Sequence, residues 1–198
     1  MKKGCRLAFC LKTCLLVSAV LGLAVENRAE CPETAAPGWY AGGGAGLMLP
    51  GHGNTLRRAA AVTVQGGWYV TDFWALELAG MCAPHASSAR GGTTVDALSV
   101  RGLFHLSGWE AFDKLFGCER FDPFATCGAS AAFSSRAAFS DGTRRTGIGP
   151  TAGIGFFYHL SEYWSVRAEA TAGLAVDEDC GMIYAVGIGV QRLFGGGL

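Results

Sequence analysis

The sequence predicts an all-β chain that folds as an eight-stranded antiparallel up-and-down transmembrane β-barrel. Three observations carry this prediction. Hydrophobic residues alternate with small or polar residues along most of the chain, with the period of two that strands have. Glycine makes up 30 of the 198 residues, which disfavours helices because an interior glycine costs a helix about 1 kcal/mol. The hydrophobic face of each segment carries almost no charge, as expected of a surface in contact with lipid.

Residues 1–29 are typical of a cleaved secretory signal peptide. A basic head within the first six residues precedes an apolar run from Leu15 to Val25. This run is shorter than the roughly 20 residues of a transmembrane helix, but it suits the core of an export signal. Cleavage is expected after Ala24 or Ala29, and an uncleaved anchor is the alternative. We therefore expect a signal peptide at 1–29, a periplasmic linker at 30–37, an outer-membrane barrel at 38–194 and a tail at 195–198.

Eight segments have strand character. In the clearest ones, outward residues such as Val62 and Val64 alternate with residues such as Thr63 and Gln65. Their length suits tilted transmembrane strands, which need about 9–11 residues. The five clear segments are Ala59–Val70, Trp74–Cys82, Val95–Leu106, Trp164–Val176 and Met182–Phe194, and the three weaker ones are Trp39–Leu49, Phe124–Ser134 and Ile148–Leu160.

The apolar faces carry two charges, Asp96 and Arg192, and both lie near strand ends where a charge costs only about 0–1 kcal/mol. A soluble ligand-binding barrel of lipocalin type is the rival interpretation, but its outer face would be more polar. Since helices are absent from the pattern, closing the sheet into a barrel is the way to pair every strand edge in lipid.

The connections alternate in character. Val70–Phe73 and Leu160–Tyr163 form tight turns among aromatic residues, which is typical of a membrane interface, and we assign this end to the periplasm. The more polar, glycine-bearing connections at the other end are assigned to the exterior. Ser107–Asp122 is long for a periplasmic turn and is expected to contain a short amphipathic helix at Glu110–Phe116.

Four stretches resemble the small bacterial outer-membrane barrels of the OmpA-like and porin-like superfamily. Gly38–Gly42, with the sequence GWYAG, is similar to the start of their first strand. Gly153–Ser161 and Trp164–Glu169 are similar to their sixth and seventh strands, and Gly187–Phe194 to their closing strand. The resemblance implies that Phe194, Val190 and Ile188 form the signal that the barrel-assembly machinery reads, although Arg192 and the residues after Phe194 depart from the family pattern.

The strand alternation directs Glu77, Arg101, Arg167 and Glu169 into the lumen, and buried charges persist only when they are paired. The resemblance implies a lumenal acid–base cluster in which Glu77, Arg101 and Arg167 match the family positions. Phe157 stands where the family has an acid on strand six, so Glu169 is expected to supply the second carboxylate. A structural plug is the favoured interpretation of this cluster, and a switchable ion gate is the alternative.

Several glycines on the lumen side are interpreted as leaving room for the rings of Tyr40, Tyr69 and Phe157. This arrangement, in which an aromatic ring lies over a glycine of a strand, is known as aromatic rescue. The glycines are Gly42, Gly44, Gly46, Gly153, Gly155, Gly187 and Gly189.

The sequence contains two further features with a chemical interpretation. His85 and Ser87 have the H-x-S spacing of lipid A deacylases, with Asp96 as the candidate acid, but an ordinary polar loop is favoured. Five cysteines follow residue 29, which fits an oxidising compartment, and a Cys118–Cys127 disulfide is expected to staple the long periplasmic connection.

Several function classes are disfavoured. Five of the 16 basic residues and one of the 16 acidic residues lie in residues 1–29, which leaves 11 basic against 15 acidic residues and argues against nucleic-acid binding. His52, His105 and His159 lie on different elements, so neither a metal site nor a cofactor is expected. The predicted function is a structural, lumen-plugged envelope protein of the outer membrane. A narrow passive channel is the alternative, and a lipid A-modifying enzyme ranks below it.

Overall fold

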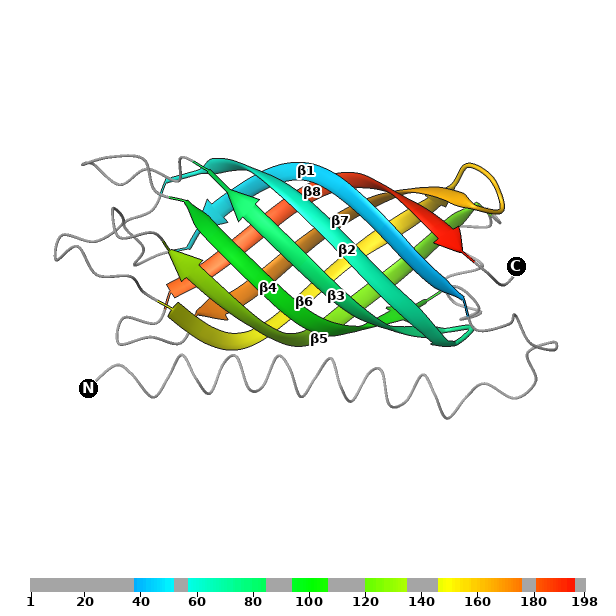
Figure 1. Ribbon diagram of the computed structural model, residues 1–198, viewed down its shortest axis with the longest axis horizontal. Coiled ribbons are helices and arrows are strands. Elements are labelled where there is room, and N and C mark those ends of the chain that lie inside the picture. The colour runs from blue at the N-terminus through cyan, green and yellow to red at the C-terminus, as the bar shows by residue number, and fades with distance from the viewer. Residues whose placement is uncertain are drawn as a thin grey trace, which may run out of the picture. The chain divides into compact units, whose positions relative to one another are not determined.

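The computed structural model describes residues 38–51, 57–84, 94–106, 120–134, 146–175 and 181–194. The chain divides into two units, residues 1–34 and 35–198, and all described residues belong to the second. These residues form a closed barrel in which each strand pairs antiparallel with the next and β8 pairs with β1 (Figure 1). The strands are β1 (Trp39–Pro50), β2 (Ala59–Thr71), β3 (Trp74–Ala83), β4 (Val95–His105), β5 (Phe121–Ser134), β6 (Thr146–His159), β7 (Trp164–Ala175) and β8 (Gly181–Phe194).

The predicted eight-stranded antiparallel barrel is confirmed, and each predicted strand corresponds to an observed one. The largest difference is at β5, which begins at Phe121 instead of Phe124. Pro123 lies in this added part, opposite Phe156 of β6. Because a proline cannot donate to a strand ladder, the sequence pattern placed Asp122 in a connection, whereas it belongs to the strand.

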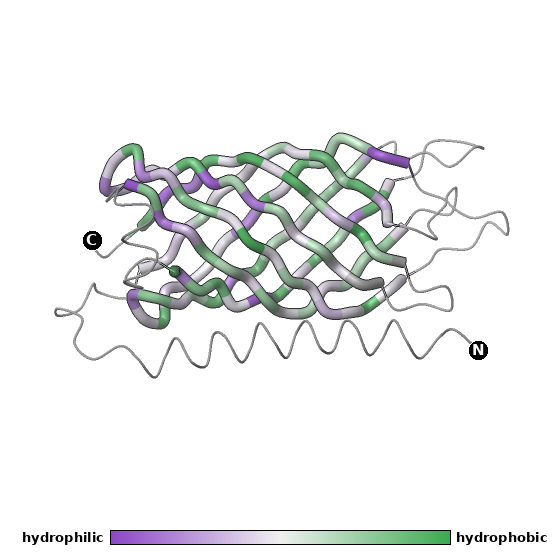
Figure 2. Tube along the Cα trace, turned by 180° about the vertical axis from the view of Figure 1, so that it is seen from behind, coloured by the Kyte–Doolittle hydropathy of each residue, from purple (hydrophilic) through white to green (hydrophobic). Residues whose placement is uncertain are grey.

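The outer wall of the barrel is hydrophobic all the way round. Among the described residues, every large hydrophobic side chain with an exposed fraction above about a third lies on the outward face of a strand or in a tight turn, and Ile154 reaches 69%. Figure 2 shows hydrophobic residues distributed around the wall instead of gathered on one side. Asp96 and Arg192 are the charged side chains on the outward faces of the described strands. This surface suits lipid and does not suit a soluble barrel in water.

Within the described ranges, no helix is long or apolar enough to cross a membrane.

Aromatic residues gather at the end of the barrel that holds the tight turns. Trp39 and Phe194 stack across the β1–β8 pair with ring centroids 4.2 Å apart, as expected from their predicted location at one end. Trp74 and Phe104 stack across the β3–β4 pair at 6.3 Å. Such rings mark the level at which lipid headgroups meet hydrocarbon.

The lumen-facing glycines have a different role from the predicted one. A Cβ at Gly46 would lie 2.2 Å from the carbonyl oxygen of Val186, and one at Gly44 would lie 2.5 Å from that of Ile188. These glycines therefore permit close approach of the β1 and β8 backbones where the barrel closes. Of the predicted set, Gly155 does accommodate an aromatic ring, but the ring is that of Phe124 and not of Tyr40, Tyr69 or Phe157.

Tyr40 instead lies over Gly67 of β2, a glycine outside the predicted set. A Cβ at Gly67 would lie 2.4 Å from the Tyr40 ring and hydroxyl. The interpretation as aromatic rescue therefore holds for Tyr40, with the wrong glycine assigned to it.

Several predictions fall outside the described residues. These are the signal peptide at 1–29, the linker at 30–37, the helix at 110–116, the tail at 195–198, the pair His85 and Ser87, and Cys118 of the expected disulfide.

Candidate functional site

Glu77 is the centre of a charge cluster inside the barrel. Its side chain is fully buried, and it lies on β3 directly opposite Arg101 of β4. The Arg101 Nε donates to Glu77 Oε1 at 2.6 Å, and Arg167 of β7 donates from Nη1 to Oε2 at 2.5 Å and from Nη2 to Oε1 at 3.2 Å. The hydroxyl of Tyr40 on β1 adds a fourth hydrogen bond at 2.7 Å. Side chains from β1, β4 and β7 therefore meet at the carboxylate of Glu77 on β3.

Glu169 is the second carboxylate of the cluster. It lies two residues after Arg167 on the same face of β7, which brings both side chains into the lumen. Arg101 holds it with two nitrogens, at 2.8 Å to Oε1 and 3.1 Å to Oε2, and Arg167 donates to Oε2 at 2.7 Å. Thr126 of β5 makes a longer contact of 3.5 Å with Oε1.

All four residues predicted for the cluster therefore meet in one network with two positive and two negative charges. This balance lets buried ionic groups persist without a net charge in a low-dielectric interior. The carboxylates accept hydrogen bonds from fixed guanidinium groups, so neither is arranged as a catalytic base. Tyr40 was not identified in the sequence as a member of this network. Its inward position on β1 was the available signal, since a buried tyrosine hydroxyl needs a partner.

An aromatic layer lies beside the cluster on the side of the tight turns. Tyr40, Phe124 and Phe157 are each at most 1% exposed, and they pack with Ala75 and Leu103. The rings of Phe124 and Phe157 stack at 4.6 Å, and the Arg167 guanidinium lies 4.8 Å from the Phe124 centroid. Phe157, at the position where the resemblance implies an acid, has its ring centroid 5.4 Å from the same guanidinium and therefore supports the arginine through its ring face.

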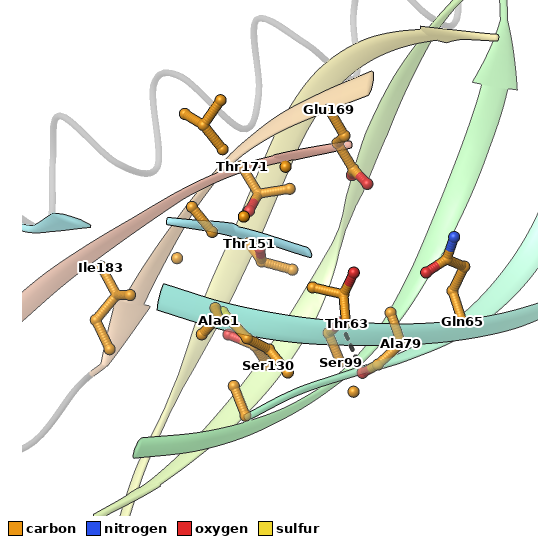
Figure 3. A pocket seen from close by; sticks show the side chains of 18 of the residues that line it. Ala61, Thr63, Gln65, Ala79, Ser99, Ser130, Thr151, Glu169, Thr171 and Ile183 are labelled. Carbon is orange, nitrogen blue, oxygen red and sulfur yellow. Dashed lines mark hydrogen bonds between the residues drawn. The ribbon is translucent and has the colours of Figure 1, made fainter. Parts of the chain in front are cut away.

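On the opposite side of the cluster the lumen contains a cavity of about 120 Å³. Arg101, Arg167 and Glu169 line it together with the hydroxyls of five residues, Thr63, Ser99, Ser130, Thr151 and Thr171. Figure 3 shows the labelled hydroxyl-bearing side chains and Glu169 approaching the space from several strands. The Ser99 hydroxyl donates to the Ala79 carbonyl at 3.3 Å. Small residues such as Ala61 and Ala79 leave this part of the lumen unfilled. Hydroxyls and ionic groups are set into a wall that is otherwise mainly apolar, and a cavity of this size has room for several water molecules.

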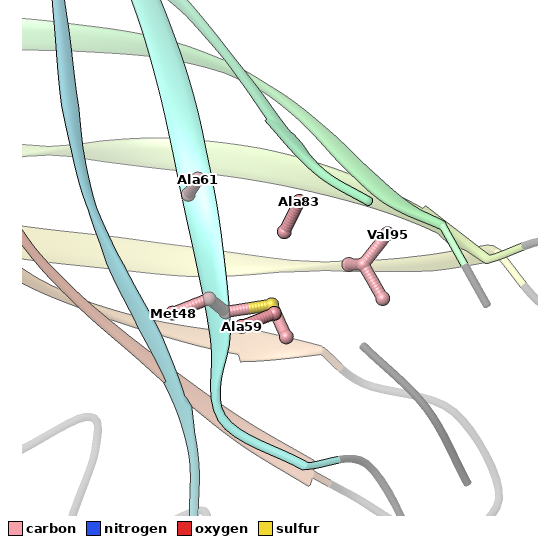
Figure 4. Close-up of a cluster of buried hydrophobic side chains, with 5 residues drawn as sticks. All are labelled: Met48, Ala59, Ala61, Ala83 and Val95. Carbon is pink, nitrogen blue, oxygen red and sulfur yellow. The ribbon is translucent and has the colours of Figure 1, made fainter. Parts of the chain in front are cut away.

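The far end of the lumen is partly covered by a small hydrophobic cluster. Met48, Ala59, Ala61, Ala83 and Val95 pack together at the strand ends of β1 to β4 (Figure 4). Met81 and Ile183 pack against this cluster, and both also line the cavity. The cavity therefore lies between the charge cluster and this apolar cover.

A second polar cluster, which the sequence analysis did not predict, lies at the tight-turn end of the lumen. His105 of β4 contacts Asp122 of β5 through Nδ1, and His159 of β6 has its Nε2 3.8 Å from the same carboxylate. The His105 ring also packs against Tyr69 and Phe157, with centroids 5.4 and 5.6 Å apart. The shared inward alternation of His105 and His159 was the available signal, but the assignment of Asp122 to a connection concealed it.

No group of three or more His, Cys, Asp or Glu side chains with the arrangement of a metal site occurs in the described part of the chain. Cys127 lies within β5 opposite Gly102 of β4, whereas Cys118 is not described, so the disulfide between them stays a prediction. Asp96, the acid suggested for the H-x-S motif, lies on the outward face of β4.

Of the comparisons with known proteins, the one with solved structures found similar proteins, and these agree with this architecture. No protein-family model matches the chain, and no curated protein matches it. Among solved structures, the outer membrane protein OprG from Pseudomonas aeruginosa is similar with a TM-score of 0.60 and 12% identity, over 84% of this chain and all of that one. Neisserial surface protein A has a TM-score of 0.59 and 12% identity, over 79% of this chain and 97% of that one. The N-terminal β-barrel domain of Pseudomonas aeruginosa OprF has a TM-score of 0.57 and 16% identity, over 79% of this chain and 99% of that one. The chain therefore has the fold of the small eight-stranded transmembrane β-barrels of bacterial outer membranes.

Proposed function

We propose that this chain is a structural protein of the bacterial outer membrane whose lumen is closed to ions and solutes. The observation that carries the proposal is the continuous contact across the lumen. Tyr40, Phe124 and Phe157 form a buried aromatic layer, and the hydroxyl of Tyr40 and the ring of Phe124 contact the charge cluster directly. A permeant ion would have to displace side chains that are held by packing and by charge-assisted hydrogen bonds.

The charge cluster supports a closed barrel for an energetic reason. Separating a buried charge from its partner costs about 3–5 kcal/mol, because the remaining charge stays in a low-dielectric environment. Arg167 is bonded to both Glu77 and Glu169, so moving it aside disrupts two such pairs at once. A plug of this kind also connects β3, β4 and β7 through the lumen and thereby stiffens the barrel.

Single-channel recording in planar bilayers tests the proposal. The purified, folded wild-type chain is expected to give no discrete current steps over a range of salt concentrations and voltages. A variant with Tyr40, Phe124 and Phe157 all replaced by alanine is expected to conduct, because it removes the aromatic layer. Trp74→Leu, on the outer wall, is the matched control and should stay silent. Discrete current steps from the wild-type barrel, with an amplitude that rises with salt concentration, would overturn the proposal.

A narrow channel is the second candidate, and the cavity above the charge cluster favours it. In this interpretation the cavity is a water-filled vestibule and the cluster a gate that opens when its ion pairs exchange partners. Glu169 borders both the cavity and the two arginines. A channel therefore predicts that Glu169→Gln changes the size or ion selectivity of current steps already present in the wild type. A closed barrel predicts no steps in either protein.

The location and export of the chain belong to the same proposal. Its fold and its hydrophobic outer wall support an outer-membrane location, and the first 29 residues support export with a cleaved signal. In isolated outer membranes the folded barrel is expected to migrate differently on gels before and after boiling. N-terminal sequencing of that band should begin after Ala24 or Ala29. Recovery of the chain from the soluble periplasm without a mobility shift would contradict this location.

A further inference from the structure

The outer wall carries one arginine that is held among aromatic rings. Arg192 lies near the end of β8 on the exposed, outward face, opposite Trp164, the first residue of β7. Its guanidinium carbon is 5.5 Å from the Trp164 ring centroid and 5.1 Å from that of Phe194. Phe194 in turn stacks on Trp39 of β1. These four residues form an aromatic–cation row across three neighbouring strands.

The charge of Arg192 has no protein counter-ion in the described part of the barrel. The ion pairs that the described residues form involve Arg101, Arg167, His105 and His159. The other outward-facing strand charge, Asp96, lies near the start of β4, at the opposite end of the barrel. Contacts with ring faces use the positive charge of a guanidinium but none of its five N–H donors. These donors therefore remain available for an anion.

The position of Arg192 selects the kind of anion. The row lies where Trp and Phe rings accumulate, which is the level of lipid headgroups. At that depth the abundant anion is the phosphate of a membrane lipid, and a guanidinium matches two phosphate oxygens with two parallel hydrogen bonds. The tight turns lie at the same end of the barrel, which we assign to the periplasmic side.

We propose that Arg192, flanked by Trp164 and Phe194, binds the phosphate of an anionic phospholipid in the periplasmic leaflet of the membrane. Phosphatidylglycerol is preferred over phosphatidylcholine, because the ammonium of a zwitterionic headgroup competes with Arg192 for the phosphate. The aromatic rings hold the guanidinium in place before the lipid arrives, which reduces the entropy lost on binding. This inference goes beyond the closed-lumen function, since it concerns the outer wall alone.

Native mass spectrometry of the purified full chain tests the site. The folded barrel in detergent is titrated with phosphatidylglycerol or with phosphatidylcholine of the same acyl chains, and retained lipid is counted. Wild type is expected to retain phosphatidylglycerol about tenfold more strongly than phosphatidylcholine, because both lipids offer the phosphate but only phosphatidylcholine carries an ammonium that competes for it. Arg192→Gln should abolish this preference, and Arg192→Lys should retain part of it, because lysine keeps the charge but not the planar fork.

Trp74→Leu is the matched control, since it removes an aromatic residue at the same end of the outer wall in a pair with Phe104. This variant should retain the wild-type preference. Heat-modifiable gel mobility establishes that each variant is folded before lipid is counted. Equal retention of the two lipids by wild type, or an unchanged preference in Arg192→Gln, would overturn the proposal. Purified lipid A is titrated in parallel, and retention of lipid A alone in an Arg192-dependent manner would also overturn it.

Discussion

Glu77 and Arg167 are joined across the lumen by two hydrogen bonds of 2.5 and 3.2 Å, although they lie on strands β3 and β7 of an eight-stranded barrel. Backbone pairing connects each strand only to its two neighbours, so this contact is a tie through the interior. Arg101 extends the tie to β4 and Tyr40 extends it to β1. The stability of the barrel should therefore depend on the lumen as well as on the strand ladders.

Replacing Glu77 with glutamine removes the negative charge that Arg101 and Arg167 share. We expect Glu77→Gln to lower the free energy of unfolding by about 3–5 kcal/mol, because two buried guanidiniums lose their common partner. Reversible urea unfolding in lipid vesicles measures this loss. Glu169→Gln is the comparison, and it should cost less because the Glu169 carboxylate is partly exposed to the cavity. Equal costs for the two variants would contradict the central role of Glu77.

Removing one hydroxyl tests the contact between Tyr40 and the cluster. Tyr40→Phe keeps the ring over Gly67 but deletes the donor that lies 2.7 Å from Glu77. We expect a loss of about 1–3 kcal/mol, the cost of leaving a buried acceptor short of a partner. Tyr184→Phe is the matched control on the outer wall and should change stability by less than about 0.5 kcal/mol. A Tyr40→Phe variant as stable as wild type would show that the hydroxyl is dispensable.

Two glycines of β1 test the close approach of strands at the closing seam. A Cβ at Gly46 would lie 2.2 Å from the Val186 carbonyl oxygen, whereas one at Gly43 would lie 3.4 Å from that of Thr63. Gly46→Ala should therefore lower stability by about 1–3 kcal/mol, since backbone atoms must move to admit the methyl group. Gly43→Ala should be tolerated. The midpoints of urea unfolding compare the two variants, and similar values would mean that the seam is not tightly closed.

The alternation of side chains was readable from sequence because the wall of this barrel separates two different environments. Lipid requires residues such as Val62 and Ile154 on one face, while the lumen accepts Glu77 and Arg101 on the other, so every strand repeats the same contrast. The four-charge cluster followed from this pattern together with the need to pair buried charges. Local sequence carried that information for each strand separately.

The features that the sequence did not reveal depend on register between distant segments. Gly46 pairs with Gly187 where the barrel closes, and no local pattern shows how near those two backbones come. Tyr40 lies over Gly67 for the same reason, since the register of β1 against β2 decides which glycine the ring covers. Asp122 was missed because Pro123 interrupts the strand pattern, although the residue itself lies inside β5 beside His105.

At Phe194 a structural contact and an expected assembly signal coincide. Phe194 stacks on Trp39 across the pair that closes the barrel, and the family resemblance implies that the assembly machinery reads this residue. Loss of the ring pair alone should cost about 1 kcal/mol when Phe194→Ala is refolded in vesicles. In cells, we expect a larger effect, seen as a marked fall in heat-modifiable barrel in the outer membrane. Phe194→Trp should restore assembly, and Phe133→Ala, at the other end of the wall, should leave it unchanged. A normal amount of folded Phe194→Ala in cells would contradict the signal role and leave Phe194 with a packing role alone.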